Sequence, residues 1–210
     1  MIIDLSHSLF SGMPIYPGDP ETVLAPSSFH EREGFSVYSL RLGSHAGTHI
    51  DSPVHFIPGL MAVDDPRVLE ACIGPAIVCD AACVIGSGEI SLSDMDIPVE
   101  NIAPGERILI ATGWSERYGM EGFHDRFPSV SKQLAEQLIE WKVTLLGVET
   151  PSLHASKSAE IHTMLLSAGI VIVENLVNLR YIAGKRVFFS AAPLKLRGID
   201  GSPVRAYAVI

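Results

Sequence analysis

The residues with the clearest chemical potential lie in one short stretch, 44–56, with the sequence Ser-His-Ala-Gly-Thr-His-Ile-Asp-Ser-Pro-Val-His-Phe. Within it, His45, His49, Asp51 and His55 all occupy odd positions. Side chains of an extended chain alternate between two faces, so these four would project to one side. Imidazole and carboxylate groups are common ligands of zinc and related divalent ions. The pattern therefore predicts a metal site.

The same stretch also permits a helical site, because His45 and His49 are four residues apart. However, Gly47, the β-branched Thr48 and Pro53 disfavour a helix here. We therefore expect an extended metal-binding loop that follows a strand. A single histidine in an apolar stretch is usually a hydrogen-bonded structural residue, but packing does not readily explain four ligand-type side chains on one face.

Two further candidates lie in the second half of the chain. Residues 158–166 have a helical pattern that contains His162 and ends before Gly169. The apolar run 170–173 predicts a buried strand, which Glu174 closes. Taken alone, each residue has an ordinary explanation, as a partly exposed helical histidine and as an acidic strand end. Their positions in the sequence do not decide between these explanations and a role in a metal site.

The pattern His-x-Gly-Thr-His-x-Asp-x-Pro-x-His resembles the signature of the metal-dependent cyclase family, which includes bacterial kynurenine formamidase (arylformamidase) and isatin hydrolase. The Glu-Asn-Leu segment that begins at Glu174 also resembles that family. So do the closing segments 192–198 and 201–206, which look like the family's last strands. The resemblance covers most of the chain.

The resemblance implies a two-metal centre with bridging carboxylates. His55 would act as general acid/base rather than as a ligand. Zinc is the expected metal, with manganese or iron as alternatives, because imidazoles combined with carboxylates suit all three. The implied ligands are His45, His49, Asp51 and Glu174 for one ion, and Asp51, Glu174 and His162 for the other.

The loop 12–20 is rich in turn-forming residues and carries Tyr16 before Pro-Gly-Asp. In the resembled family an aromatic residue at this position lines the substrate site, typically a Trp in kynurenine formamidases. We therefore expect Tyr16 to bind substrate, the alternative being a solvent-facing tyrosine in a turn. Glu149 and His154 stand where Asp is usual or common in the family, and we expect both to border the site and to influence substrate choice.

Three functions follow from these observations. The first is an arylformamidase-like hydrolase that releases formate from N-formylkynurenine, with metal-activated water and His55 as general acid/base. The second is a ring-opening hydrolase of a cyclic amide or lactone, such as isatin. The third is a non-catalytic metal-binding protein, which would need a closed ligand shell and no spare acid/base.

Composition and charge disfavour some partners and locations for this protein. The net charge is −9 and no run of Lys or Arg is present, which disfavours nucleic acid as a partner. No segment reaches the roughly 18–20 apolar residues of a membrane span, and the first residues do not form a leader peptide. We expect a cytoplasmic enzyme with a small-molecule substrate. Three cysteines are too few and too irregularly spaced for a disulfide framework, so we expect Cys72, Cys79 and Cys83 to be core residues.

Strands alternate with helices along the chain, which predicts one α/β domain over residues 1–210. The resemblance implies a swivelling β/β/α-type fold, with a mainly β core and surrounding helices, and assembly as a homodimer or homotetramer. In the strand 35–42 we expect Val37, Leu40 or their neighbours to pack inward. The other predicted strands are 1–8, 76–80, 107–114 and 143–148, and the other predicted helices are 67–72 and 131–141, with a capped turn at 91–96.

Overall fold

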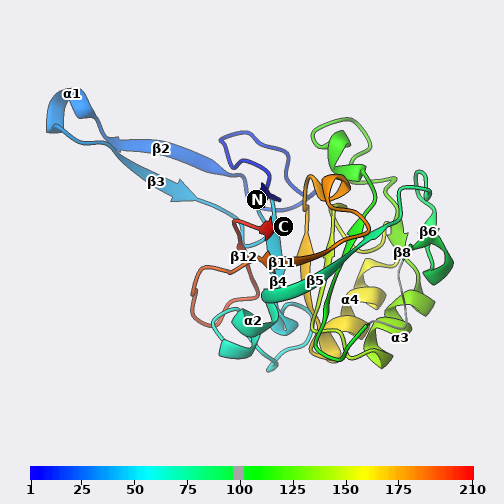
Figure 1. The fold of residues 1–210 in the computed structure, drawn as a ribbon. Helices are drawn as coiled ribbons and strands as arrows, with labels where there is room; N and C mark the ends of the chain where they lie inside the picture. Colours follow the sequence, from blue (N-terminus) through cyan, green and yellow to red (C-terminus); the bar gives the residue numbers. More distant parts are fainter. Residues whose placement is uncertain (97–101) are drawn as a thin grey trace.

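A nine-stranded sheet organises the fold, in the order β1–β13–β11–β5–β7–β9–β10–β4–β12 (Figure 1). The computed structural model describes residues 1–96 and 102–210. The strands of this sheet are β1 (Ile2–Asp4), β4 (His49–Asp51), β5 (Ile73–Asp80), β7 (Arg107–Ala111), β9 (Leu145–Val148), β10 (Val171–Glu174), β11 (Arg186–Ser190), β12 (Gly201–Pro203) and β13 (Tyr207–Val209).

The four central strands, β5, β7, β9 and β10, are parallel, and the strands on both sides of them are antiparallel. Their apolar runs are buried on both faces because each face carries its own core cluster. In β5, for example, Ile77 and Cys79 belong to one cluster, while Ala76 and Val78 belong to the other. The strands predicted at 76–80, 143–148 and 170–173 are confirmed. The strand predicted at 107–114 is present but shorter, because β7 ends at Ala111 and Trp114 begins a 3₁₀ helix.

Two helices, α3 (Lys132–Glu140) and α4 (Ser158–Ser167), pack on one face of the sheet. The Ser131 side chain caps α3 by accepting a hydrogen bond from the Leu134 amide, and this helix confirms the one predicted at 131–141. The predicted helix near 67–72 is α2 (Pro66–Ala71), which Asp65 caps. The predicted turn at 91–96 contains a 3₁₀ helix, η2 (Leu92–Asp94), with a capping box.

The described residues form a mixed α/β domain with a curled, mainly β sheet and four α-helices, which confirms the predicted fold class. Two smaller two-stranded sheets complete it: β2 (Val23–Ser28) with β3 (Val37–Arg41), and β6 (Glu89–Ile90) with β8 (Ser129–Val130). The remaining short helices are α1 (His30–Glu33), η1 (Pro53–His55), η4 (Trp114–Arg117) and η5 (Leu179–Tyr181).

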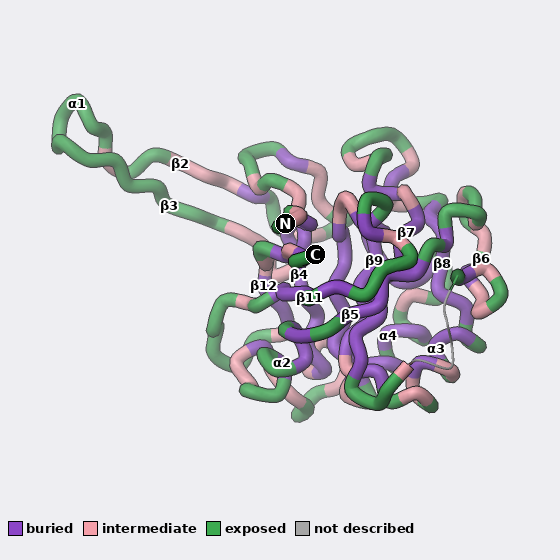
Figure 2. The backbone as a smooth tube through the Cα atoms, viewed as in Figure 1, coloured by how far each residue is buried: buried purple, intermediate pink, exposed green. Residues whose placement is uncertain are grey.

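One segment extends away from this domain. Strands β2 (Val23–Ser28) and β3 (Val37–Arg41) form a hairpin, with α1 at its tip, that projects from the main body (Figures 1 and 2). The predicted strand at 35–42 is confirmed, but its inward packing is wrong: Val37 is 45% exposed and Leu40 is 63% exposed. The alternation is that of a strand, but no core cluster of the described residues includes either side chain.

The cysteines and the membrane prediction have mixed outcomes. Cys72 and Cys79 are buried in the core, as expected, whereas Cys83 is exposed, so its assignment to the core is wrong. Cys83 lies in the turn that follows β5, three residues after the strand ends at Asp80. Among the described residues, no helix is long and apolar enough to cross a membrane.

Candidate metal centre

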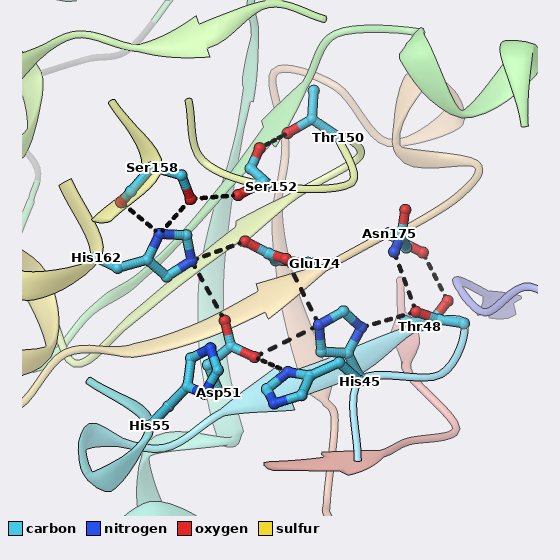
Figure 3. A network of polar contacts seen from close by, with 12 residues as sticks. His45, Thr48, Asp51, His55, Thr150, Ser152, Ser158, His162, Glu174 and Asn175 are labelled. Atoms are coloured by element: carbon cyan, nitrogen blue, oxygen red, sulfur yellow. Dashed lines mark hydrogen bonds and ion pairs between the residues drawn. The ribbon is translucent and has the colours of Figure 1, made fainter. Parts of the chain in front are cut away.

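The pairing of β4 with β10 builds the centre of the site. The two strands are antiparallel, and the register places His49 opposite Glu174 and Asp51 opposite Ile172. Ile50, between the two ligand residues, belongs to the core cluster on the other face of the sheet. Alternation along β4 therefore directs His49 and Asp51 to the face that α4 covers. There, Asp51 meets His162 (Figure 3).

The first group of potential ligand atoms surrounds one oxygen of Asp51. Asp51 Oδ1 lies 2.8 Å from His45 Nδ1 and 3.4 Å from His49 Nε2. His49 Nε2 also lies 3.5 Å from Glu174 Oε2. The ligand atoms of His45, His49 and Asp51 are close enough together to hold one metal ion.

The second group uses the other oxygen of each carboxylate. His162 Nε2 lies 3.0 Å from Glu174 Oε1 and 3.4 Å from Asp51 Oδ2. Asp51, His162 and Glu174 are all buried and also lie within reach of one ion. Asp51 and Glu174 thus direct one oxygen to each group, which is the arrangement that bridging carboxylates require. Three imidazoles and two buried carboxylates are a donor set that fits divalent transition metals.

In His45, His49 and His162, the ring nitrogen that does not face Asp51 or Glu174 contacts another oxygen atom. His49 Nδ1 lies 2.8 Å from the Gly47 carbonyl oxygen, and His162 Nδ1 lies 2.8 Å from that of Ser158. A carbonyl oxygen accepts a hydrogen bond, so Nδ1 is protonated in both rings and Nε2 is left for a metal. The corresponding partner of His45 Nε2 is Asp200, at 2.8 Å.

The electrostatics of the cluster favour protonated histidines when no metal is bound. Burial lowers the pKa of His49 and of His162, but hydrogen bonds to Asp51 and Glu174 more than offset it and raise each pKa to about 10. For His45, burial likewise opposes the hydrogen bond to Asp51, and the pKa rises to about 9. Burial raises the pKa of Asp51, but hydrogen bonds from His162, His45 and His49 hold it well below its usual value. Buried carboxylates thus need cationic partners, which a metal ion would replace.

His55 lies beside the metal groups rather than within them. It ends the 3₁₀ helix η1, so it reaches the site through a turn of helix and not through the extended chain that the odd spacing predicts. Its Nδ1 lies 3.0 Å from Asp200 Oδ2. The neighbouring Phe56 stacks on the His162 ring, with ring centroids 4.9 Å apart. Asp200 and Phe56 are site residues that sequence reasoning missed; the acidic residue next to Gly201 in the closing segment was the available signal.

A cavity of about 350 Å³ opens onto these groups. Its size suits a small ligand. Tyr16 lines it, and His124 packs edge-on against Tyr16 with ring centroids 5.7 Å apart. Asn175 also lines it, and its buried Oδ1 accepts no hydrogen bond from the described residues. The other lining residues include His45, His49, Asp51, His55, Phe56, Tyr118, Ser152, Ser158, His162 and Glu174.

Glu149 and His154 do not line this cavity, so the expectation that they border the site is wrong. Glu149 points back into the fold and accepts hydrogen bonds from the Thr112 and Gly113 amides. His154 faces the start of α4, where its Nδ1 accepts from the Ser156 and Lys157 amides. Glu149 follows β9 directly and His154 lies further along the same loop, which turns both side chains away from the metal groups.

Comparison with known proteins places the chain in a family. The Cyclase family model matches residues 3–155, so the chain belongs to the Cyclase family, and the predicted resemblance is confirmed. A kynurenine formamidase of Bacillus cereus is 33% identical over 207 residues, covering 97% of this chain and 95% of that protein.

Solved structures agree with this placement. Isatin hydrolase A from Labrenzia aggregata, bound to benzyl benzoate, has a TM-score of 0.88 and 26% identity, covering 99% of this chain and 93% of that one. A structure described as a potential metal-dependent hydrolase with cyclase activity has a TM-score of 0.81 and 27% identity, covering 99% and 96%. The donor set and these relatives together support a metal-dependent amide hydrolase.

Proposed function

We propose that this chain hydrolyses the amide bond of a small aromatic formamide, with N-formylkynurenine as the substrate, to release formate and the free aryl amine. One observation carries the proposal: two histidine–carboxylate groups share the buried Asp51, and Glu174 of the second group also faces His49 of the first, at a cavity with aromatic walls. The 33% identity to a kynurenine formamidase supports the choice of a formamide.

His45, His49 and Asp51 would hold one divalent ion, and Asp51, His162 and Glu174 the other, with Glu174 also facing the first. When bound, such ions lower the pKa of water and polarise a carbonyl group. Zinc is the proposed metal, with manganese or iron as alternatives, and two ions per chain are proposed because each carboxylate serves both groups.

His55 is the proposed general acid/base. It lines the cavity, and its Nδ1 is occupied by Asp200, which leaves Nε2 for proton transfer. In hydrolysis it would accept a proton from the attacking water and return it to the leaving nitrogen, so that the amide becomes an amine and formic acid, which ionises to formate by releasing the second proton of the water to solvent. No proton is gained or lost by the protein over the cycle.

The aromatic walls would orient the substrate ring. Tyr16 and His124 lie on one side, Phe56 stacks on His162, and Tyr118 completes the lining. Stacked and edge-on aromatic contacts are each worth about 0.5–1.5 kcal/mol beyond the area that they bury. They favour an aryl formamide over an aliphatic one.

A second candidate is ring opening of a cyclic amide such as isatin. The structural likeness to isatin hydrolase A supports it, since the folds superimpose over nearly the whole chain. Both reactions would use the same residues, and only the ring attached to the scissile bond differs.

A direct comparison of substrates tests the proposal. The metal-loaded protein is assayed with N-formylkynurenine and with isatin, and kcat/KM is determined for each. We expect the formamide to be preferred at least 10-fold, about 1.4 kcal/mol in transition-state binding. A preference for isatin would replace the proposed substrate with the cyclic amide.

A further inference from the structure

One carboxylate outside the metal-ligand set contacts two histidines of the site at once. Asp200 Oδ2 lies 2.8 Å from His45 Nε2 and 3.0 Å from His55 Nδ1. An ionised carboxylate oxygen only accepts hydrogen bonds, so both ring nitrogens carry the proton in these contacts. The contact of His55 therefore assigns its proton to Nδ1. His45 faces a second carboxylate, Asp51, through Nδ1, so the contact with Asp200 assigns Nε2–H to this ring when a metal ion takes the place of the proton on Nδ1.

We propose that Asp200 is a positioning residue that holds His45 and His55 in these tautomers. His45 then keeps Nδ1, which faces Asp51, available to a metal ion. His55 keeps Nε2 available for the proton transfer of hydrolysis, and this part of the inference rests on the proposed function. A single carboxylate oxygen thereby couples the metal centre to the general acid/base.

The chain places Asp200 at this point through the pairing of β12 with β4. The Asp200 carbonyl oxygen accepts hydrogen bonds from the Ser52 amide, at 2.9 Å, and from the Ser52 hydroxyl, at 2.8 Å. The next residue, Gly201, pairs with Asp51. A Cβ atom on Gly201 would lie 2.7 Å from the Ile50 carbonyl oxygen and 2.9 Å from His45 Cε1, so only glycine lets the His45 ring lie this close to β12.

The alternative is that Asp200 is itself a metal ligand, because His45, His55 and Asp200 also lie within reach of one ion. That site would need the lone pair of His45 Nε2, and a neutral imidazole has one lone pair to offer. The opposite nitrogen of His45 faces Asp51, whose side chain is 1% exposed, whereas that of Asp200 is 38% exposed. The buried carboxylate has the greater need for a cation, which assigns His45 Nδ1 to the metal and Nε2 to Asp200.

The tautomers can be measured without altering Asp200. In the zinc-loaded protein labelled with ¹⁵N-histidine, NMR distinguishes protonated, unprotonated and metal-bound ring nitrogens, and a His55→Gln variant identifies the His55 signals. We expect His55 to have a protonated Nδ1 and an unprotonated Nε2, and His45 to have a metal-bound Nδ1 and a protonated Nε2. The opposite tautomer of His55, or binding of the metal through His45 Nε2, would overturn the inference.

Asp200→Asn provides the second test, because it removes the charge and one acceptor oxygen at constant size. We expect kcat and zinc affinity, measured by competition with a chelator, each to fall about 10- to 100-fold, while KM changes little. The Nδ1–H signature of His55 should also be lost. The control is Asp64→Asn: Asp64 accepts a hydrogen bond from the Gly198 amide of the same closing segment, 3.0 Å away, but contacts neither histidine.

Two outcomes of this variant would contradict the inference. Unchanged histidine spectra and zinc affinity would show that Asp200 positions neither ring. Loss of a whole equivalent of zinc, with the His55 tautomer intact, would make Asp200 a ligand. Failure of every chain, wild type included, to hydrolyse N-formylkynurenine would count against the proposed function alone, because the spectra and zinc affinity need no substrate.

Discussion

At the level of a single residue, His55 is the place where the proposed catalysis can be tested separately from metal binding. It lines the cavity and bonds to Asp200, but it is absent from the two groups that share Asp51. We expect His55→Ala to retain its metal content and to lose about 10²- to 10⁴-fold in kcat, the usual contribution of a general acid/base. Metal analysis and steady-state kinetics measure both quantities.

His30→Ala is the matched control for that variant, because His30 is exposed in α1, at the tip of the β2–β3 hairpin. It should leave metal content and kcat unchanged. Loss of metal together with activity in His55→Ala would instead make His55 a ligand. Retention of both would favour a non-catalytic metal-binding protein or a different acid/base.

Metal binding at this site should release protons. Without metal, the pKa of His45 is raised to about 9, and those of His49 and His162 to about 10, so all three rings are protonated at pH 7. A metal ion must displace these protons, so its affinity should rise with pH up to about pH 10. Calorimetric titration of zinc in buffers of different ionisation enthalpy counts the protons. A pH-independent affinity without proton release would contradict this prediction.

The same pKa shifts predict the stability of the chelated protein. A histidine pKa raised above its unfolded value contributes stability that is fully present below about pH 6.5 and is lost as the pH rises through the folded value. The free energy of unfolding of the metal-free protein should therefore fall between about pH 6.5 and pH 10. Urea unfolding at several pH values measures it, and a rise over this window would contradict the assignment.

At the scale of elements, Glu149 ties the end of β9 to the segment that carries Tyr118. Its carboxylate accepts from the Thr112 and Gly113 amides, the Ser115 hydroxyl and the Leu179 amide. In Glu149→Gln an amide NH₂ replaces one carboxylate oxygen. This group cannot accept hydrogen bonds, so some of these donors lose their acceptor. We expect a loss of about 1–3 kcal/mol in the free energy of unfolding. A higher KM should accompany it, because Tyr118 lines the cavity just beyond η4.

Glu160→Gln is the control for Glu149→Gln, since Glu160 is exposed on α4 and pairs with Lys132 on the surface. Its effect on unfolding should stay within about 0.5 kcal/mol. Equal effects of the two substitutions in urea unfolding would show that the hydrogen bonds of Glu149 contribute nothing specific.

The elements that position the site differ in how far sequence could predict them. The candidate ligands of the stretch 44–56 can be recognised from the local sequence alone, because ligand-type residues recur there within a few positions. The contact between His45 and Asp200 spans 155 residues and depends on the pairing of β12 with β4, which no local pattern specifies. Glu149 and His154 illustrate the same limit: their place after a buried strand was clear, but the direction in which the loop turned them was not.

Burial was predictable only where one element covers another. The apolar runs of the central strands are buried because helices and neighbouring strands cover both faces. Residues 37–41 have equally strand-like alternation, but they form a projecting two-stranded hairpin and are exposed. Alternation specifies the conformation of a strand, whereas its burial depends on partners elsewhere in the fold.

At the scale of the whole molecule, the projecting β2–β3 hairpin is the surface that we propose for association between copies of this chain. We propose that the chain forms a homodimer or homotetramer and that this hairpin contacts a second copy. It exposes Phe35, Tyr38 and Leu40, and it carries both acidic and basic residues, so two copies could pair with complementary charge as well as apolar area.

Substitution on the hairpin tests this assembly. The double variant Tyr38→Ser/Leu40→Ser should shift the protein toward the monomer in light scattering coupled to size-exclusion chromatography. Ile85→Ser is the control, because Ile85 is 86% exposed but lies in the turn after β5. A wild-type monomer at micromolar concentration, or a double variant with unchanged mass, would contradict the proposal.

The central claim is that the buried histidine–carboxylate groups hold divalent metal that the hydrolysis of an amide requires. The most direct measurement is formate release from N-formylkynurenine together with metal content, on the purified protein, after chelation and after return of zinc or manganese. We predict about two metal ions per chain, loss of formate release on chelation, and its recovery on metal return. Undiminished hydrolysis by fully chelated protein, or no metal bound under any loading condition, would contradict the claim.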